Sequence, residues 1–275
     1  DYSIVIGGNG NTAGFVGTNL YSIVAGGGSN RSFGNGASVL GGINNLSSGD
    51  YSVSVGGSSN LARGPYVSIL GGYFNTGFAS GSVVAGGKLN VAQGVMSSVL
   101  GGEANNASGA YSIVAGGLWN VAQSGNSSVL GGIRNIARAT GAVIVAGSRN
   151  TIYGSQQSMI GAGNLNTING TGMSVILQGQ SNTISSGGFN TIANGHNVNI
   201  HSSNFSFAAG KDITINSVAN FAFGQNITSN HSGVTILGDA SSSSKTSAFP
   251  NSAYLYYQSG VHIKGPFVLN SGATP

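Results

Sequence analysis

The sequence predicts an all-β protein built as a parallel β-solenoid with about fifteen residues per coil. A Gly-Gly pair returns every fifteen residues from Gly26-Gly27 to Gly131-Gly132, and an asparagine follows three residues after each pair. A unit this short buries no core alone, so successive coils must stack on one another. No segment shows the i, i+3, i+4 apolar spacing of a helix, so we expect few or no helices.

Each coil is expected to hold two short strands. The first is the apolar run before the glycine pair, for example Ile113-Val114-Ala115, and the second follows the asparagine, for example Asn120-Val121-Ala122. Short β-branched runs closed by glycine are typical of strands.

The period divides the chain into four segments. Residues 1–189 carry coils of fifteen to sixteen residues, 190–203 form an irregular transition, and 204–240 carry coils of fourteen residues. Residues 241–275 are predicted to hold a polar linker and a terminal capping hairpin, with strands at 253–257 and 261–263.

Both faces of the first strand are apolar. On one face large and small residues alternate, because Ile23 with Ala25 is followed by Ser38 with Leu40. Stacked strands lie only about 4.8 Å apart, so we interpret this alternation as close packing in the core. The opposite face carries Val24 and its equivalents. A thin coil covers only one of two apolar faces, so we expect a homo-oligomer about the rod axis.

The asparagines form one row along the rod. We interpret the row as an interior ladder in which each amide bonds the next coil or the turn. The alternative is a row of amides that binds a repeating ligand. The row comprises Asn30, Asn45, Asn60, Asn75, Asn90, Asn105, Asn120, Asn135, Asn150, Asn166 and Asn182.

A candidate contact surface comes from residues outside the apolar rows. These are Tyr73, Phe74, Trp119, Arg134 and Arg138. Tyr73-Phe74 and Trp119 stand where other coils carry Ser or Lys, so we expect them to be exposed. Local packing on a neighbouring coil is the alternative.

No catalytic, cofactor or metal site is predicted. The five acidic residues stand in distant coils, whereas glycosidase chemistry needs a carboxylate pair about 5 to 9 Å apart. The four histidines lie in the irregular and terminal parts, and there is no cysteine. The nine Lys and Arg residues are scattered and form no cluster that could bind along a phosphate backbone, so nucleic acid is not an expected partner. No apolar run is long enough for direct membrane insertion.

These repeats resemble the head repeats of trimeric autotransporter adhesins of the YadA type. The likeness rests on Ser-Val or Ser-Ile before Ala-Gly-Gly or Leu-Gly-Gly, and on Phe-Ala-Phe-Gly at 221–224, and it covers roughly residues 2–240. It implies a left-handed parallel β-roll, a homotrimer of chains side by side, and an extracellular location at the tip of a surface fibre. Residues 251–265 are also similar to the stretch before the self-cleaving chaperone domain of phage and viral fibres. The surface of a virion is therefore an alternative location to the surface of a cell.

The expected function is therefore non-enzymatic: a trimeric fibre segment that projects and binds a surface receptor, either protein or glycan. One alternative is an ice-binding or other surface-binding solenoid, which needs an even outward row of Thr or Asn. Pairs such as Tyr73-Phe74 and Lys88-Leu89 after the glycines are too uneven for that row. Another is a polysaccharide-active β-helix enzyme, which the separated acids disfavour.

Overall fold

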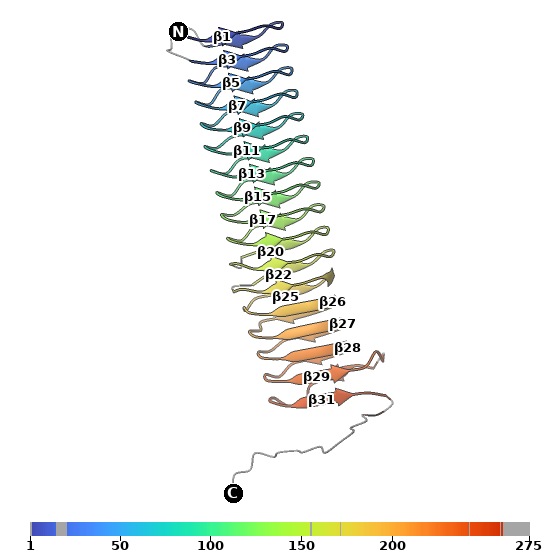
Figure 1. Ribbon diagram of the computed structural model, residues 1–275. Coiled ribbons are helices and arrows are strands. Elements are labelled where there is room, and N and C mark those ends of the chain that lie inside the picture. The colour runs from blue at the N-terminus through green and yellow to red at the C-terminus, as the bar shows by residue number, and fades with distance from the viewer. Residues whose placement is uncertain are drawn as a thin grey trace, which may run out of the picture.

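The computed structural model describes residues 2–14, 21–154, 156–170, 172–241, 243–258 and 260, which form a parallel β-solenoid. Figure 1 shows a stack of coils with the N-terminal strand, Ile4–Val5, at one end of the rod and the last described strand, Ala253–Tyr256, at the other. The described residues contain strands, turns and bends, with no helix that could cross a membrane. The predicted all-β parallel solenoid is confirmed.

The first side of the rod carries the strands that precede the glycine pairs. They are β1 (Ile4–Val5), β3 (Ile23–Val24), β5 (Ser38–Val39), β7 (Val53–Ser54), β9 (Ser68–Ile69), β11 (Val83–Val84), β13 (Ser98–Val99), β15 (Ile113–Val114), β17 (Ser128–Val129), β19 (Val143–Ile144), β21 (Met159–Ile160), β23 (Val175–Ile176), β29 (Thr235–Gly238) and β31 (Ala253–Tyr256).

The second side carries the strands that follow the asparagines. They are β2 (Thr12–Ala13), β4 (Arg31–Ser32), β6 (Leu46–Ser47), β8 (Leu61–Ala62), β10 (Thr76–Gly77), β12 (Val91–Ala92), β14 (Asn106–Ala107), β16 (Val121–Ala122), β18 (Ile136–Ala137), β20 (Thr151–Tyr153), β22 (Thr167–Asn169), β25 (Thr183–Ser185) and β30 (Lys245–Thr246).

Four further strands lie toward the C-terminal end. The short β24 (Gly179–Gln180) lies in the turn between the two sides. The long β26 (Thr191–His201), β27 (Phe207–Ile215) and β28 (Phe221–Ser229) each run through both sides of a coil.

Each strand pairs in parallel with the strand one coil further on. The offset in sequence number is fifteen where Val114 faces Val129, sixteen where Val143 faces Met159 and fourteen where Phe207 faces Phe221. The predicted changes of period are therefore changes of coil length within one continuous stack.

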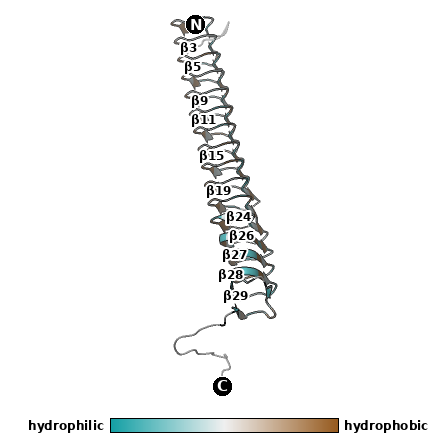
Figure 2. Cartoon of the chain, turned by 90° about the vertical axis from the view of Figure 1, so that its right-hand side faces the viewer, coloured by the Kyte–Doolittle hydropathy of each residue, from teal (hydrophilic) through white to brown (hydrophobic). Residues whose placement is uncertain are grey.

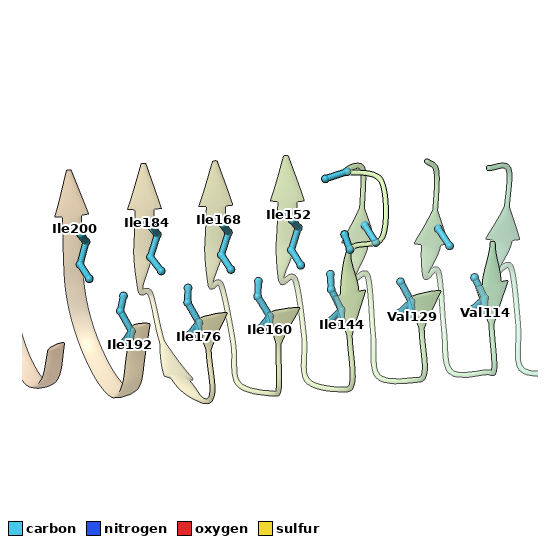
Figure 3. Close-up of a cluster of buried hydrophobic side chains, with 14 of the residues drawn as sticks. Val114, Val129, Ile144, Ile152, Ile160, Ile168, Ile176, Ile184, Ile192 and Ile200 are labelled. Carbon is cyan, nitrogen blue, oxygen red and sulfur yellow. The ribbon is translucent and has the colours of Figure 1, made fainter. Parts of the chain in front are cut away.

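The core is a narrow double row of side chains inside the coil. Figure 3 shows Ile144, Ile160, Ile176 and Ile192 of the first side pointing toward Ile152, Ile168, Ile184 and Ile200 of the second side. All of these side chains are fully buried. Before Ile152 the second side carries alanines, such as Ala107, Ala122 and Ala137. The change from alanine to isoleucine supplies more apolar volume to the longer coils.

The alternating large and small residues lie outside the coil, so their interpretation as core packing was wrong. Val24 is fully buried, whereas Leu40, Leu70, Leu100 and Leu130 are each about half exposed. From Val24 to Ile192 the inward row of the first side holds Val or Ile at every rung except Ser54, which is also fully buried. The outer face has no such uniform row.

Two segments are more regular than expected. Residues 190–203 hold β26, whose register shifts only between Ile192 and Gly195. Strand β31, expected as half of a hairpin, instead pairs in parallel with β29 as one more rung. This pairing gives the last β29 groups partners, as in the bond from Thr235 N to Ser252 O at 2.9 Å. The expected partner strand at 261–263 lies outside the described residues.

The turn that returns to the first side is closed in two ways. In the shorter coils before Gly147 the backbone closes it, as in the bond from Ser97 N to Gly94 O at 3.1 Å. In the longer coils that follow, a side chain of the preceding coil accepts instead, as in Ser174 N to Ser158 Oγ at 3.0 Å. The same row continues through Asn190, Ser206 and Asn220.

A buried lysine ends the inward column that begins as the asparagine row. Lys245 continues the row of Val198, Ile213 and Ile227 and is 1% exposed. Its ammonium donates to the carbonyl oxygens of Gln225, Ser241 and Ser243 at 3.0 to 3.3 Å. Asp239 lies 3.5 Å away, and hydrogen bonds from Ser241 and the Gln258 N–H hold its pKa below its ordinary value.

Candidate contact surfaces

The predicted asparagine row lies inside the coil, where each amide joins two rungs. The Oδ1 of Asn105 accepts the backbone N–H of Asn120 at 2.9 Å. Its Nδ2 donates to Gly101 O at 3.0 Å in the same coil and to Gly117 O at 2.9 Å in the next coil. This pattern repeats along the rod and fixes the glycine turns.

The row leaves no side chain free for a ligand. All eleven predicted asparagines are 0 to 1% exposed. The row begins earlier than predicted, because Asn11 bonds Gly7 O, Gly27 O and Asn30 N in the same way. The longer spacing from Asn11 to Asn30 hid this member. At the other end Val198 replaces asparagine and donates its N–H to Asn182 Oδ1 at 3.0 Å.

The second glycine of each pair is required by the turn. Gly117 has a φ of 88°, which L-residues rarely adopt. A Cβ at this position would overlap the carbonyl oxygen of Gly132 in the next coil. The glycine recurs once per coil because the backbones of successive coils are in close contact at this position.

The two residues between each glycine pair and its asparagine form an exposed edge, which we call the Gly-Gly edge. The second of these residues has a positive φ, with values of 54° at Phe74, 55° at Trp119 and 56° at Arg134. This conformation costs roughly 1 to 2 kcal/mol for residues other than Gly, Asn or Asp. Bulky side chains at such positions are candidates for a role outside the fold.

The structure brings four of the five predicted contact residues to this edge. Tyr73 and Phe74 pack edge to face, with ring centroids 4.4 Å apart. Arg134 lies over the Trp119 ring at 4.4 Å from its centroid. The exposed fractions are 46% for Tyr73, 45% for Phe74 and 47% for Trp119. Arg138 lies instead on the second side, over the ring of Tyr153 at 5.3 Å.

The first side and its adjoining turn carry a surface without charge. It consists of three columns of outward positions: the first residue of each first-side strand and the residues two before and two after it. We call this surface the charge-free face. Its first rungs are Tyr2, Ile4 and Ile6, then Tyr21, Ile23 and Ala25, then Gly36, Ser38 and Leu40, and its last is Asn251, Ala253 and Leu255.

None of these positions holds Lys, Arg, Asp or Glu. The described charged residues lie elsewhere: Arg31, Asp50, Arg63, Lys88, Glu103, Arg134, Arg138, Arg149, Lys211, Asp212, Asp239 and Lys245. Aromatic rings stack along the face in the Tyr51–Tyr66 and Phe189–Phe205 pairs, at centroid distances of 5.3 and 5.2 Å. Charged residues therefore avoid particular positions of the coil. This can be recognised only when it is known which positions point inward and which point outward.

The charge-free face is large for a single chain. Rungs about 4.8 Å apart and columns about 7 Å apart give a strip roughly 75 Å long and 13 Å wide, or about 1,000 Å². Serines such as Ser98 and Ser128 lie among the leucines of the strip, so the usual limit of a few hundred Å² for exposed apolar patches on monomers applies only to its apolar part. The strip matches the area of about 800 Å² that one partner buries in a typical stable interface.

A row of threonines on the second side was missed in the sequence. Thr151, Thr167, Thr183, Asn199, Thr214, Thr228 and Thr246 occupy one outward column. The six threonine side chains make no hydrogen bond with other described residues, and the Asn199 amide bonds Asn197 Oδ1 at 3.4 Å. The adjacent column is tied by pairs such as Ser185 and His201 at 2.6 Å. Figure 2 shows this end of the rod as hydrophilic around β26 to β28. The changes of coil length concealed the column, because its members recur at unequal spacings.

The described carboxylates do not form a pair. Glu103 is bonded to Lys88 at 2.8 Å, which raises the pKa of that lysine. Asp50 accepts the Asn35 N–H, and Asp212 accepts from Asn197. No described carboxylate bonds an imidazole, and no group of three or more His, Asp or Glu residues in the described ranges could hold a metal.

No protein-family model matches this sequence, and no curated protein matches it.

Replacing Asn105 by Ala is expected to lower the free energy of unfolding by about 3 kcal/mol. The change leaves the Asn120 N–H and the Gly101 carbonyl without partners inside the coil, and each orphaned group costs roughly 1 to 3 kcal/mol. Denaturant unfolding followed by circular dichroism measures the loss. Asn106→Ala is the matched control, because its side-chain oxygen has no hydrogen-bond partner within the described chain. Equal losses of unfolding free energy for the two variants would refute the role of Asn105 in joining successive coils.

Replacing Phe74 by Asn is expected to change the free energy of unfolding by less than about 1 kcal/mol. Asparagine accepts the positive φ of 54° more easily than phenylalanine, which offsets the lost ring contact. A core substitution such as Ile69→Ala removes a fully buried side chain and should cost about 2 to 5 kcal/mol. If Phe74→Asn destabilises as much as Ile69→Ala, Phe74 is a packing residue and leaves the contact surface.

Proposed function

We propose that this chain is a non-enzymatic segment of an extracellular homotrimeric fibre that projects from a cell or virion surface and binds a receptor. In this proposal three left-handed β-rolls stand side by side and cover their charge-free faces. The single observation that supports it most directly is the absence of Lys, Arg, Asp and Glu from that face along the described rod. A solvent-facing surface of this length would normally carry charges for solubility.

The occupant that fits this face is another copy of the same chain. In most coils before Gly147 large and small residues alternate between two columns of the face, as with Ile113 and Ala115 followed by Ser128 and Leu130, whereas two rungs carry a pair of valines. Parallel copies without stagger bring identical rungs to the same height, so most levels hold one large and one small side chain per chain. This keeps the volume at the contact nearly constant along the rod.

Three copies fit better than two because the face extends over one side and the adjoining turn. A surface with two adjoining parts can contact two neighbours at once, as in a closed ring with head-to-tail contacts. The resemblance to trimeric adhesin heads also predicts an assembly of three chains.

The Gly-Gly edge and the second side then face outward. They carry the described exposed arginines and the candidate aromatic residues, for example Phe74, Trp119 and Arg134. Three chains present each of these sites three times, so weak single contacts add to a strong attachment. Backbone hydrogen bonds from coil to coil give the rod the stiffness that projection needs.

A charge placed on the charge-free face is expected to prevent assembly. The wild-type chain should have a molar mass in solution of three times 27.2 kDa by light scattering, and Leu100→Lys should have the mass of one chain. Leu100 is 53% exposed in the single chain, so the variant should keep the β-rich circular dichroism spectrum. Gln93→Lys, on the second side, is the control and should stay trimeric. A stable wild-type monomer would overturn the proposal.

The threonine row supports a second candidate function, binding to ice or to another crystalline surface. Six threonines and Asn199 present hydroxyl, methyl and amide groups at the rung repeat. The side chain of threonine is stiff at χ1, so the row is held in a regular array. This row is on a different surface from the uneven pairs at the Gly-Gly edge.

If the row binds ice, the wild-type chain should lower the freezing point of water without equally lowering the melting point. Replacing both Thr167 and Thr183 by Lys should abolish this thermal hysteresis, because long charged side chains interrupt the array. Val91→Lys, in the same outward column nearer the N-terminus, should have little effect. Absence of hysteresis in the wild type excludes ice as the ligand.

A further inference from the structure

Three of the nine Lys and Arg residues of the chain fall within 134–149. Arg134 and Arg149 occupy the same column of the Gly-Gly edge on successive rungs, as the bonds from Arg134 N to Leu118 O and from Arg149 N to Ile133 O show. Arg138 is four residues beyond Arg134 in the same coil, so its Cα lies within about 14 Å of that of Arg134. All three residues are exposed.

This cluster has no acidic partner among the described residues. The neighbouring acids along the edge are Glu103, two rungs before Arg134, and Asp212, four rungs after Arg149. Neither acid forms an ion pair with these arginines, because the described ion pairs are Lys88–Glu103, Lys211–Asp212 and Lys245–Asp239. Glu103 is already paired with Lys88 at 2.8 Å. The same edge therefore pairs opposite charges at one place and stacks like charges at another.

Like charges on adjacent rungs destabilise the stack. Arg134 and Arg149 also have φ values of 56° and 55°, which arginine does not favour. Two costs at one place, without a carboxylate partner in the described chain, indicate an anion that arrives from outside.

Aromatic rings hold two of the guanidinium groups in position. Arg134 lies 4.4 Å from the centroid of Trp119, and Arg138 lies 5.3 Å from that of Tyr153. Arg138 Nε also donates to Gln123 Oε1 at 3.0 Å. Groups held in advance lose less freedom when they bind a carboxylate or sulfate.

Trp119 leaves one ring face uncovered by large side chains. Arg134, on the following rung, covers one face. On the preceding rung the same column holds Ala104, whose methyl group covers little of an indole. The Trp119 side chain is 47% exposed, so a flat apolar group such as the face of a sugar ring can stack there.

We propose that Trp119, Arg134, Arg138 and Arg149 form a binding site for an acidic glycan. A sugar ring stacks on Trp119 above Ala104, and carboxylate or sulfate groups of the same glycan bind the three arginines. Three arginines are few for nucleic acid, because its binding depends largely on the number of phosphates that Lys and Arg residues neutralise. The proposal rests on the proposed function in one respect: the site stays open because the charge-free face, not the Gly-Gly edge, meets the other copies.

Titration calorimetry at low and high salt tests the site with four probes on the intact chain. The probes are a sulfated heparin oligosaccharide, a carboxylated oligogalacturonate, a neutral dextran oligosaccharide and a single-stranded DNA oligonucleotide of similar charge. We expect at least one acidic glycan to bind, dextran not to bind, and affinity to fall with salt. The glycan that binds more tightly identifies the acidic group.

The variants separate charge from stacking. Arg134→Gln with Arg149→Gln should weaken glycan binding by roughly tenfold or more, since bonds to charged groups are lost. Arg31→Gln with Arg63→Gln, two other exposed arginines, should leave binding within about twofold. Ala104→Phe keeps every charge but fills the space beside Trp119, and it should also weaken binding. The Gly-Gly edge accepts phenylalanine at the equivalent Phe74, so this variant should fold.

Three results would overturn the inference: no binding to either acidic glycan, equal weakening by both arginine pairs, or tighter binding of DNA than of either glycan. Light scattering on the same samples separates this inference from the proposed function. A trimer that binds no acidic glycan overturns the site alone. A monomer that binds the glycan through these residues overturns the trimer and keeps the site.

Discussion

The hydrogen bonds between successive coils fix the distance at which each side chain meets its counterpart, and the rest of the structure depends on that distance. Leu130 N bonds Ile144 O at 2.9 Å, and equivalent bonds recur along the rod. At a separation of about 4.8 Å, equivalent side chains on successive rungs are in contact. A residue type that fits one rung therefore fits the next, and one that does not fit is in direct conflict with the equivalent residue. Each column therefore has its own composition: Val and Ile within, Asn at the inner turn, and uncharged residues on the charge-free face.

The period and phase of the stack were predictable because two residue types cannot be exchanged in the turn. Gly117 has no space for a Cβ, and Asn120 supplies both a donor and an acceptor where two rungs meet. Such positions show no variation in the coils before Gly147, so the sequence displays them directly. Coil length changes elsewhere without breaking the pattern, which is why Asn166 and Asn182 were also found.

The direction of the first strand's two faces could not be read from the sequence. Val24 points inward and Ala25 with Leu40 outward, yet both columns are apolar. An alternating strand reveals its buried face only when the other face is polar. The contact residues illustrate a related limit. Arg138 is four residues from Arg134 but on another side of the rod, and the threonine column spans coils of unequal length, so neither placement follows from a single period.

The buried Lys245 has a consequence for how rods meet end to end. A solenoid with an open apolar end offers its last rung as a template on which a second molecule can add, as at exposed sheet edges. Here the column that continues the asparagine row finishes in an ammonium group, which is already buried and held by the carbonyl oxygens of Gln225, Ser241 and Ser243. These oxygens have a donor within their own chain. The lysine thus leaves fewer unpaired acceptors at the last described rung for a second molecule to use.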